Sequence, residues 1–150
     1  MHSAAEMQQF GERVASVARG SDVLILTGDL GAGKTTFAQG VARGLGITEP
    51  VTSPTFVLSK NYAGTPLGLL HLDVYRIASS DELLDLWSES DAQHALTLVE
   101  WGAPWRSEFG NSVIELVFTA PIPHEHSVRE VELIAHSSDV DLADRIAGVM

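Results

Sequence analysis

Residues 28–35 read Gly28-Asp29-Leu30-Gly31-Ala32-Gly33-Lys34-Thr35, which matches the phosphate-binding loop pattern G-x-x-x-x-G-K-[ST] at every fixed position. An unbroken apolar run, Val23 to Leu26, precedes the loop and is typical of a strand buried on both faces of a parallel sheet. After the loop, apolar residues recur every four positions at Phe37, Val41 and Leu45, which predicts a helix that packs one face on that sheet. The pattern therefore lies between a strand and a helix, which is the context that a phosphate-binding loop requires.

The fixed positions of this loop have separate chemical roles. Glycine gives the backbone conformations that other residues avoid, so several N–H groups can point at one oxyanion. The N-terminus of the following helix adds partial positive charge. We expect Lys34 to reach the β- and γ-phosphates and the Thr35 hydroxyl to bind Mg²⁺. The loop predicts binding of a nucleoside triphosphate; the alternative is a glycine-rich turn that carries Lys-Thr by coincidence.

Composition limits the class of protein. A chain of 150 residues, of which 45% are hydrophobic, predicts one globular domain spanning residues 1–150. The absence of cysteine excludes disulfides, thiol nucleophiles and zinc–thiolate sites. Residues 1–20 contain no long apolar stretch, so we expect neither a signal peptide nor a membrane span, and a cytoplasmic location.

The charge of the chain bears on its partners. Its net charge is −11, from 20 acidic and 9 basic residues. A protein that binds nucleic acid by itself usually has a clustered basic face, because neutralising phosphates drives that binding. Here Lys34 and Lys60 are the only lysines, and the seven arginines are scattered singly. We therefore expect no DNA binding, and contact with RNA only through a protein partner.

Three further helices are predicted from caps and apolar spacing. Ser3 to Glu6 has the spacing of a capping box, and the apolar stripe behind it ends near Gly20. Ser80 begins a short acidic helix, and Asp139 and Asp141 open the last one, where acids favour the positive end of the helix.

Five β-rich segments complete the pattern. Residues 54–62 and 66–74 predict one antiparallel hairpin, and residues 113–118 and 128–134 predict a second. Residues 96–99 are another buried strand candidate. The fold class that follows is α/β: a three-layer, P-loop NTPase-like domain with a mixed sheet, which has a parallel core plus antiparallel hairpins.

The run from His71 to Arg76 places an acid where a strand would end. On a strand, His71, Asp73 and Tyr75 share one face. If that strand end lies near the phosphates, Asp73 could hold a metal-bound water or orient a nucleophile. The alternative is an edge strand with a solvated polar face.

A second acid follows the apolar run Leu98-Val99 at Glu100 and precedes Trp101. An apolar strand that ends in an acid is the Walker B arrangement, in which the carboxylate meets the metal beside the loop threonine. The alternative is an acid that caps an ordinary strand.

Four motifs occur together in a fixed order. They are GDLGAGKTT at the loop, TSPTF at residues 52–56, HLDVYR at residues 71–76 and VEW at residues 99–101. In this order and spacing, residues 22 to about 106 resemble the bacterial TsaE family, formerly called YjeE. Members of that family are small ATPases required for installing threonylcarbamoyl on an adenosine of tRNAs that read ANN codons. Ala103 departs from the pattern, because many members have an acid there.

The resemblance implies ATP and Mg²⁺ as cofactors. It assigns nucleotide contacts to the loop residues Asp29, Leu30, Gly31, Ala32, Gly33, Lys34, Thr35 and Thr36, and to Thr55 and Trp101. Thr55 would lie near the γ-phosphate, with Thr52 as a weaker contact. Asp73, Glu100 and Lys34 would be catalytic, and Thr35 and Glu100 would bind the metal.

By the same resemblance, the partners are TsaB and TsaD, TsaC acts upstream in the pathway, and tRNA is contacted only indirectly. Two other functions stay open. One is a small-molecule P-loop kinase, although paired lid arginines are not evident in the sequence. The other is a non-catalytic switch that responds to nucleotide binding alone.

Several other residues have two interpretations. Arg76 and Arg106 could stabilise transition-state charge as arginine fingers or be ordinary surface or ion-paired arginines. His124 and His126 form an H-x-H pair in a proline-rich turn, which favours a solvated loop over a metal site.

Overall fold

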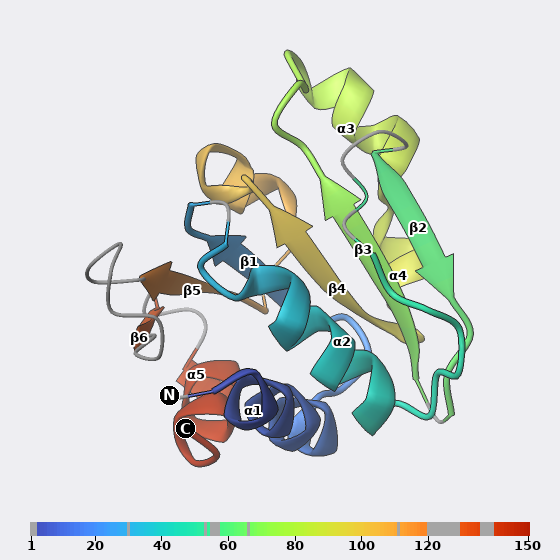
Figure 1. Cartoon of the computed structure of the whole chain (residues 1–150). Coiled ribbons are helices and arrows are strands. Elements are labelled where there is room, and N and C mark those ends of the chain that lie inside the picture. The colour runs from blue at the N-terminus through green and yellow to red at the C-terminus, as the bar shows by residue number, and fades with distance from the viewer. Residues whose placement is uncertain are drawn as a thin grey trace.

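The computed structural model of the chain has a six-stranded sheet between two layers of helices (Figure 1). It describes residues 3–29, 31–52, 54, 58–65, 67–110, 112–119, 130–135 and 140–150. In chain order the elements are α1 (Ala4–Val17), β1 (Val23–Thr27), α2 (Lys34–Gly44), β2 (Ser59–Tyr62), β3 (Gly68–Asp73), α3 (Ser80–Leu86), α4 (Glu89–Ala92), β4 (Ala95–Glu100), the 3₁₀ helix η1 (Ala103–Glu108), β5 (Val113–Thr119), β6 (Glu130–Ile134) and α5 (Val140–Ala147).

The strands of the sheet lie in the order β2-β3-β4-β1-β5-β6. The four inner strands are parallel, while β2 and β6 pair antiparallel at the two edges. This arrangement confirms the mixed sheet with a parallel core. It also confirms both hairpins, although the strands are shorter than the predicted segments 54–62 and 66–74, and residues 120–129 lie outside the described part of the chain.

Caps mark the ends of several helices, and the Ser3 cap is the one that the sequence predicted. The Ser3 side chain accepts a hydrogen bond from the Glu6 N–H at 3.1 Å and begins α1. Ser79 caps α3 in the same way through the N–H of Glu82, and Gly46, with φ 74°, follows the end of α2. Asp139 lies outside the described residues, but α5 forms where it was expected. In the described part of the chain, no helix is long and apolar enough to cross a membrane.

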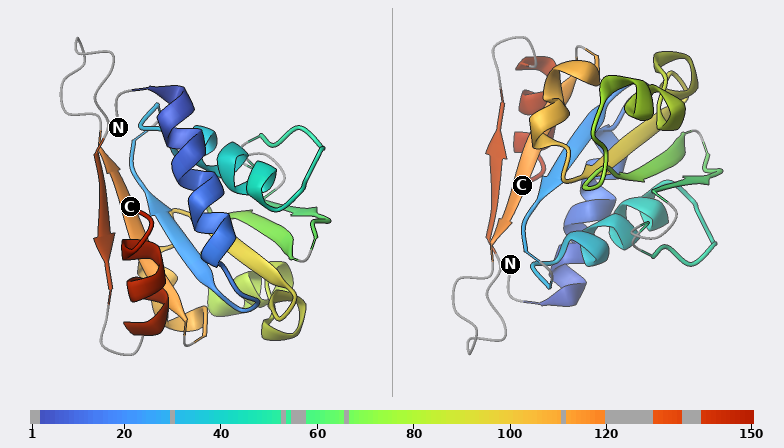
Figure 2. Two further views of the ribbon diagram at one scale, coloured as in Figure 1. Left: turned by 90° about the horizontal axis from the view of Figure 1, so that it is seen from below. Right: turned by 90° about the horizontal axis from the view of Figure 1, so that it is seen from above.

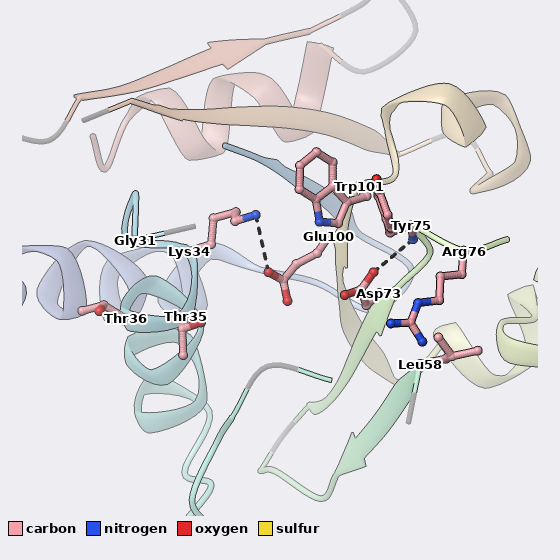
Figure 3. Close-up of a pocket in the computed structure, with 11 residues that line it drawn as sticks. Gly31, Lys34, Thr35, Thr36, Leu58, Asp73, Tyr75, Arg76, Glu100 and Trp101 are labelled. Atoms are coloured by element: carbon pink, nitrogen blue, oxygen red, sulfur yellow. Dashed lines mark hydrogen bonds and ion pairs between the residues drawn. The ribbon is translucent and has the colours of Figure 1, made fainter. Parts of the chain in front are cut away.

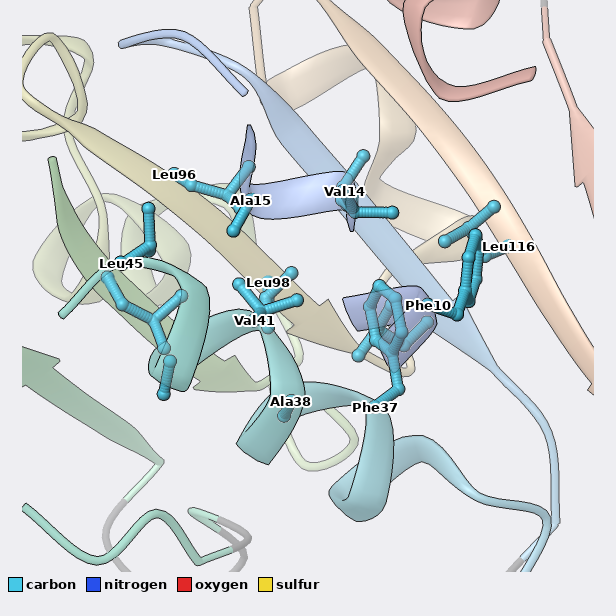
Figure 4. Packing of buried hydrophobic residues seen from close by; sticks show 14 of the residues in the cluster. Phe10, Val14, Ala15, Phe37, Ala38, Val41, Leu45, Leu96, Leu98 and Leu116 are labelled. Carbon is cyan, nitrogen blue, oxygen red and sulfur yellow. The ribbon is translucent and has the colours of Figure 1, made fainter. Parts of the chain in front are cut away.

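One face of the sheet is covered by α1, α2 and α5 (Figures 2 and 4). Phe37 lies at the centre of this layer, with its ring centroid 5.2 Å from that of Phe10 and 5.4 Å from that of Phe118. The two helices α1 and α2 cross closely because two glycines face the contact. A Cβ atom at Gly11 would meet the carbonyl oxygen of Phe37 at 2.4 Å, and one at Gly40 would meet that of Gln8 at 2.1 Å. Packing on this face fixes α2, and with it the loop that precedes α2.

The opposite face is covered by α3, α4 and η1, so the three-layer prediction is confirmed (Figure 1). Trp87 packs edge-on against Phe109, with ring centroids 5.3 Å apart, and its Nε1–H donates to the hydroxyl of Thr97 at 3.1 Å. Trp87 is therefore a core residue.

A partly buried ion pair joins α5 to the amino end of the sheet. Arg145 donates from both terminal nitrogens to the carboxylate of Asp22, at 2.7 and 3.0 Å, and also to the carbonyl oxygen of Val17. The hydrogen bonds that Arg145 donates to Asp22 raise the pKa of Arg145 above its ordinary value, against a smaller opposing effect of burial. The guanidinium stays charged, and α1, β1 and α5 are held together.

Candidate nucleotide-binding site

The loop between β1 and α2 has the backbone geometry of an anion-binding turn. Gly31 and Gly33 have φ values of 83° and 110°, in the left-handed region that glycine adopts without strain. A Cβ atom at Gly31 would meet no atom within 4 Å, so the conformation, not space, requires glycine there. Gly33 is the N-cap of α2 and has no side chain to cap the first turn. The N–H groups of that turn are therefore available to an anion.

A cavity of about 500 Å³ opens in front of this loop (Figure 3). Its lining comes from the loop, the start of α2 and the ends of β3 and β4. The lining residues are Gly31, Gly33, Lys34, Thr35, Thr36, Leu58, Asp73, Tyr75, Arg76, Glu100 and Trp101.

Strand pairing explains why two acids reach this cavity. Glu100 at the end of β4 lies in register with Leu26 of β1 on one side and with Asp73 of β3 on the other. All three strands are parallel, so their carboxyl ends meet at the edge of the sheet from which the loop emerges. The two predicted acids and the loop therefore face one another.

Glu100 contacts two basic side chains. Its Oε1 lies 3.7 Å from Nζ of Lys34, and its Oε2 lies 3.1 Å from Nε2 of His71. The residues Lys34 and Glu100 are only 8% and 5% exposed. Burying an isolated charge at this depth would cost desolvation free energy, and the attraction between these two opposite charges offsets part of that cost.

Asp73 ends β3 and turns the chain. Its Oδ1 accepts a hydrogen bond from the N–H of Tyr75 at 3.0 Å, which closes a turn of the kind that Asp side chains favour. The expectation that Tyr75 shares a strand face with His71 and Asp73 is therefore wrong, because the strand stops before Tyr75. The alternative of an edge strand with a solvated face is also wrong, because β3 lies between β2 and β4 and His71 is fully buried.

Trp101 lies across the mouth of the cavity. Its backbone has a φ of 64°, an uncommon value for a bulky residue, which aims the indole back toward the loop. The Nζ of Lys34 lies 4.8 Å from the centroid of the Trp101 ring, and the ring of Tyr75 lies 5.2 Å away on a tilted plane. Trp101 remains 41% exposed. An indole that contacts both Lys34 and solvent is placed to respond to a ligand of Lys34.

We therefore expect Trp101 to report nucleotide binding. Movement of Lys34 to a phosphate would remove its contact with the indole and change the fluorescence of the protein. Trp101→Phe should abolish most of the nucleotide-dependent change in tryptophan emission, because Trp87 is buried in the opposite layer and Trp105 packs against the same cluster. A titration with ATP measures this, with Trp105→Phe as the matched control. A full signal in the Trp101→Phe protein would make Trp101 a packing residue only.

The other predicted site residues divide into three groups. Gly31, Gly33, Thr35 and Thr36 line the cavity with Lys34. Asp29 and Ala32 form a tight turn of the loop, in which the Ala32 N–H donates to the Asp29 carbonyl oxygen at 3.0 Å. Leu30 and Thr55, with His124 and His126, lie outside the described residues, so their assignments stay predictions.

The two candidate arginines differ in place. Arg76 is exposed and lines the cavity. Arg106 is not among the lining residues, and its Nη2 donates to the carbonyl oxygen of Val113 at 2.7 Å. The hydroxyl of Thr52 accepts a hydrogen bond from Nζ of Lys60 at 2.6 Å.

Sequence reasoning missed the part that Tyr75, Leu58 and His71 take in the site. Tyr75 and Leu58 line the cavity, and His71 contacts Glu100 beneath it. The sequence around the motif held a signal for two of them, because His71 and Tyr75 each lie two residues from Asp73. Leu58 directly precedes β2, and its carbonyl oxygen accepts a hydrogen bond from the N–H of Asp73 at 2.8 Å.

A strand, a glycine-rich loop, a helix and two acids from neighbouring parallel strands define a P-loop NTPase-like protein. Comparison with known proteins narrows this class. The family described as "Threonylcarbamoyl adenosine biosynthesis protein TsaE" matches residues 1–128. The chain belongs to the TsaE family, which takes part in tRNA threonylcarbamoyladenosine biosynthesis.

Individual relatives agree with this assignment. The tRNA threonylcarbamoyladenosine biosynthesis protein TsaE of Bacillus subtilis is 48% identical over 96 residues, which cover 64% of this chain and 60% of that one. The protein of the same name from Treponema pallidum is 40% identical over 107 residues, covering 71% and 78%. The match thus spans about 60% of the length of the Bacillus relative. A crystal structure of Bacillus subtilis YdiB has a TM-score of 0.75 and 30% identity, covering 99% of this chain and 91% of that one.

Proposed function

We propose that the chain binds ATP with Mg²⁺ and hydrolyses it as the ATPase subunit of the threonylcarbamoyladenosine pathway. One observation carries the proposal: Lys34, Asp73 and Glu100 converge on a single cavity in front of the glycine-rich loop. This set of groups suits a polyphosphate that carries a divalent metal. The phosphates need positive charge and N–H donors, and the metal needs carboxylates a few ångströms away.

The residues present fit both groups. Lys34 and the first turn of α2 would hold phosphate oxygens, and Thr35 and Glu100 would hold Mg²⁺, which neutralises charge that develops on the phosphates. In the described part of the chain, no three His, Asp or Glu side chains form a metal cluster. That agrees with Mg²⁺, which takes most of its ligands from phosphates and water when a protein supplies one or two.

Binding requires an exchange of partners inside the cavity. Lys34 lies against Glu100 and Trp101. A triphosphate offers Lys34 several anionic oxygens in place of one carboxylate, so its ammonium would turn from Glu100 to the phosphates. The same movement would open Oε1 of Glu100 to the metal and release the indole of Trp101.

Asp73 would act on the attacking water. It lies beside Glu100 in the register of the sheet, and its Oδ1 is held by the N–H of Tyr75. A fixed carboxylate next to the metal-binding side can orient a water and accept its proton. Asp73 is only 5% exposed, which limits competition from bulk solvent.

Turnover by the isolated chain should be slow. Of the described residues, the cavity lining includes one arginine, the exposed Arg76, so a second positive group for transition-state charge would come from a partner. We propose TsaB and TsaD as these partners, with TsaC upstream, and the cytoplasm as the compartment of the pathway.

A screen of small-molecule acceptors during ATP turnover tests the kinase alternative, because a kinase would transfer the γ-phosphoryl group to one of them. If ATP binds but is never consumed, with or without partners, the switch alternative holds.

We expect the isolated chain to bind tRNA poorly even at low salt. The net charge is −11, and several basic side chains already face acids: Arg43 faces Glu12, Arg19 faces Asp141, and Arg145 is held by Asp22. These arginines are already engaged with carboxylates, and the net negative charge of the chain repels RNA.

The measurement is binding of tRNA to the chain, to TsaB–TsaD and to all three together, in the ATP, ADP and nucleotide-free states. We expect tRNA to associate only when the partners are present, and the partners to bind the chain in a nucleotide-dependent way. Tight, salt-sensitive binding of tRNA by the chain alone would contradict the charge argument, and partner binding that ignores the nucleotide would contradict the coupling.

A further inference from the structure

His71 is a buried histidine that the proposed chemistry does not use directly. It lies on the interior strand β3, is 0% exposed, and directs Nε2 at Oε2 of Glu100 at 3.1 Å. An ionised carboxylate can only accept hydrogen bonds, so beside Lys34 it is the imidazole Nε2–H that donates. The other ring nitrogen, Nδ1, is buried and has no hydrogen-bond partner among the described residues, so nothing there competes for the proton.

The two oxygens of Glu100 are therefore held differently. Oε2 contacts a histidine that the core fixes in place, while Oε1 faces the ammonium of Lys34 in the cavity. Lys34 is the partner that a triphosphate would remove. After that exchange the contact with His71 would still hold Oε2, and Oε1 would stay aimed into the cavity.

We propose that His71 is a positioning residue, which orients the Glu100 carboxylate so that one oxygen faces the metal of the nucleotide complex. This inference rests on the proposed function, because it assigns to Glu100 a metal that accompanies ATP. It goes beyond that function by dividing the roles of the two oxygens. Side chains that hold a metal-binding carboxylate set its geometry, and losing one typically reduces metal affinity or activity about 10- to 100-fold.

Three variants test whether the two oxygens of Glu100 have these separate roles. His71→Leu removes the donor while keeping a buried apolar side chain, and His71→Gln keeps an N–H group near the position of Nε2. His94→Leu is the matched control, since His94 is exposed at the turn before β4. Binding of Mn²⁺, as a spectroscopic substitute for Mg²⁺, is measured by electron paramagnetic resonance with a non-hydrolysable ATP analogue bound. Affinity for the same analogue without metal, and the melting temperature, are measured in parallel.

The expected result is a loss of Mn²⁺ affinity in His71→Leu of about 10- to 100-fold, with metal-free nucleotide affinity unchanged. His71→Gln should recover most of that loss, and His94→Leu should match the wild type. Wild-type Mn²⁺ affinity in His71→Leu would overturn the inference. So would equal losses in the Leu and Gln variants, or a parallel loss of metal-free nucleotide binding, because these indicate a purely structural role. If the wild-type protein with nucleotide bound takes up no Mn²⁺, the proposed function itself fails.

Discussion

Replacing Lys34 with alanine is expected to abolish productive binding of ATP. Lys34 is the one lysine that lines the cavity, and its ammonium is buried beside the loop. Charged hydrogen bonds contribute roughly 1.5–3 kcal/mol each, so losing two contacts to phosphate weakens binding by at least about 100-fold. Without Lys34, Glu100 would also face the phosphates as an uncompensated negative charge. Calorimetric titration with ATP measures the loss.

The control for this variant is Arg43→Ala. Arg43 lies on the same helix as Lys34 and carries the same charge, but it forms an exposed ion pair with Glu12. Its loss should leave ATP affinity unchanged. The melting temperature of both variants separates binding from folding, because removing Lys34 also takes a buried partner from Glu100. Unchanged ATP affinity and turnover in Lys34→Ala would refute the assignment of the loop.

Glu100→Gln and Asp73→Asn are expected to separate binding from turnover. Both changes keep the shape of the side chain and remove its negative charge. Nucleotide binding should survive, and metal-free nucleotide should even bind Glu100→Gln more tightly, since Lys34 loses a competing carboxylate. Turnover should fall on the order of 10²-fold or more, the scale for removing a positioned acid, base or electrostatic group.

Steady-state ATP hydrolysis with the partners present measures this effect. Glu132→Gln on the edge strand β6 makes the same chemical change at an exposed position and should hydrolyse ATP like the wild type. If Glu100→Gln also hydrolyses ATP at the wild-type rate, the Glu100 carboxylate only ends its strand. If Asp73→Asn hydrolyses ATP at that rate, Asp73 serves only to close the turn at Tyr75.

The sequence predicted the features that depend on local pattern. The loop, the buried strand before it and the helix after it follow from glycine positions and apolar spacing over a short window. The Ser3 cap and both hairpins follow in the same way, because caps and turns are decided by residues close in the chain.

Features that depend on distant partners could not be predicted. Alternating polar residues at His71 and Asp73 are usual for an edge strand, yet β3 lies inside the sheet. There the buried His71 has a polar partner in Glu100, 29 residues further along the chain. Asp22 and Arg145 lie 123 residues apart, and no periodicity relates them. At the end of β3 the N–H of Tyr75 donates a hydrogen bond to the Asp73 side chain, and a pattern of alternating hydrophobicity does not predict that contact.

The most direct test of the account is ATP turnover by the chain alone and with TsaB, TsaD and tRNA, with and without Mg²⁺. We expect slow Mg²⁺-dependent hydrolysis by the chain alone and faster hydrolysis in the assembly. The increase in hydrolysis that the partners cause should be lost in each of three variants, Lys34→Ala, Glu100→Gln and Asp73→Asn. Hydrolysis that persists in Lys34→Ala, or that needs no Mg²⁺, would contradict the site described here. An assembly that modifies tRNA at the wild-type rate while containing Lys34→Ala would contradict the ATPase as the function of this chain.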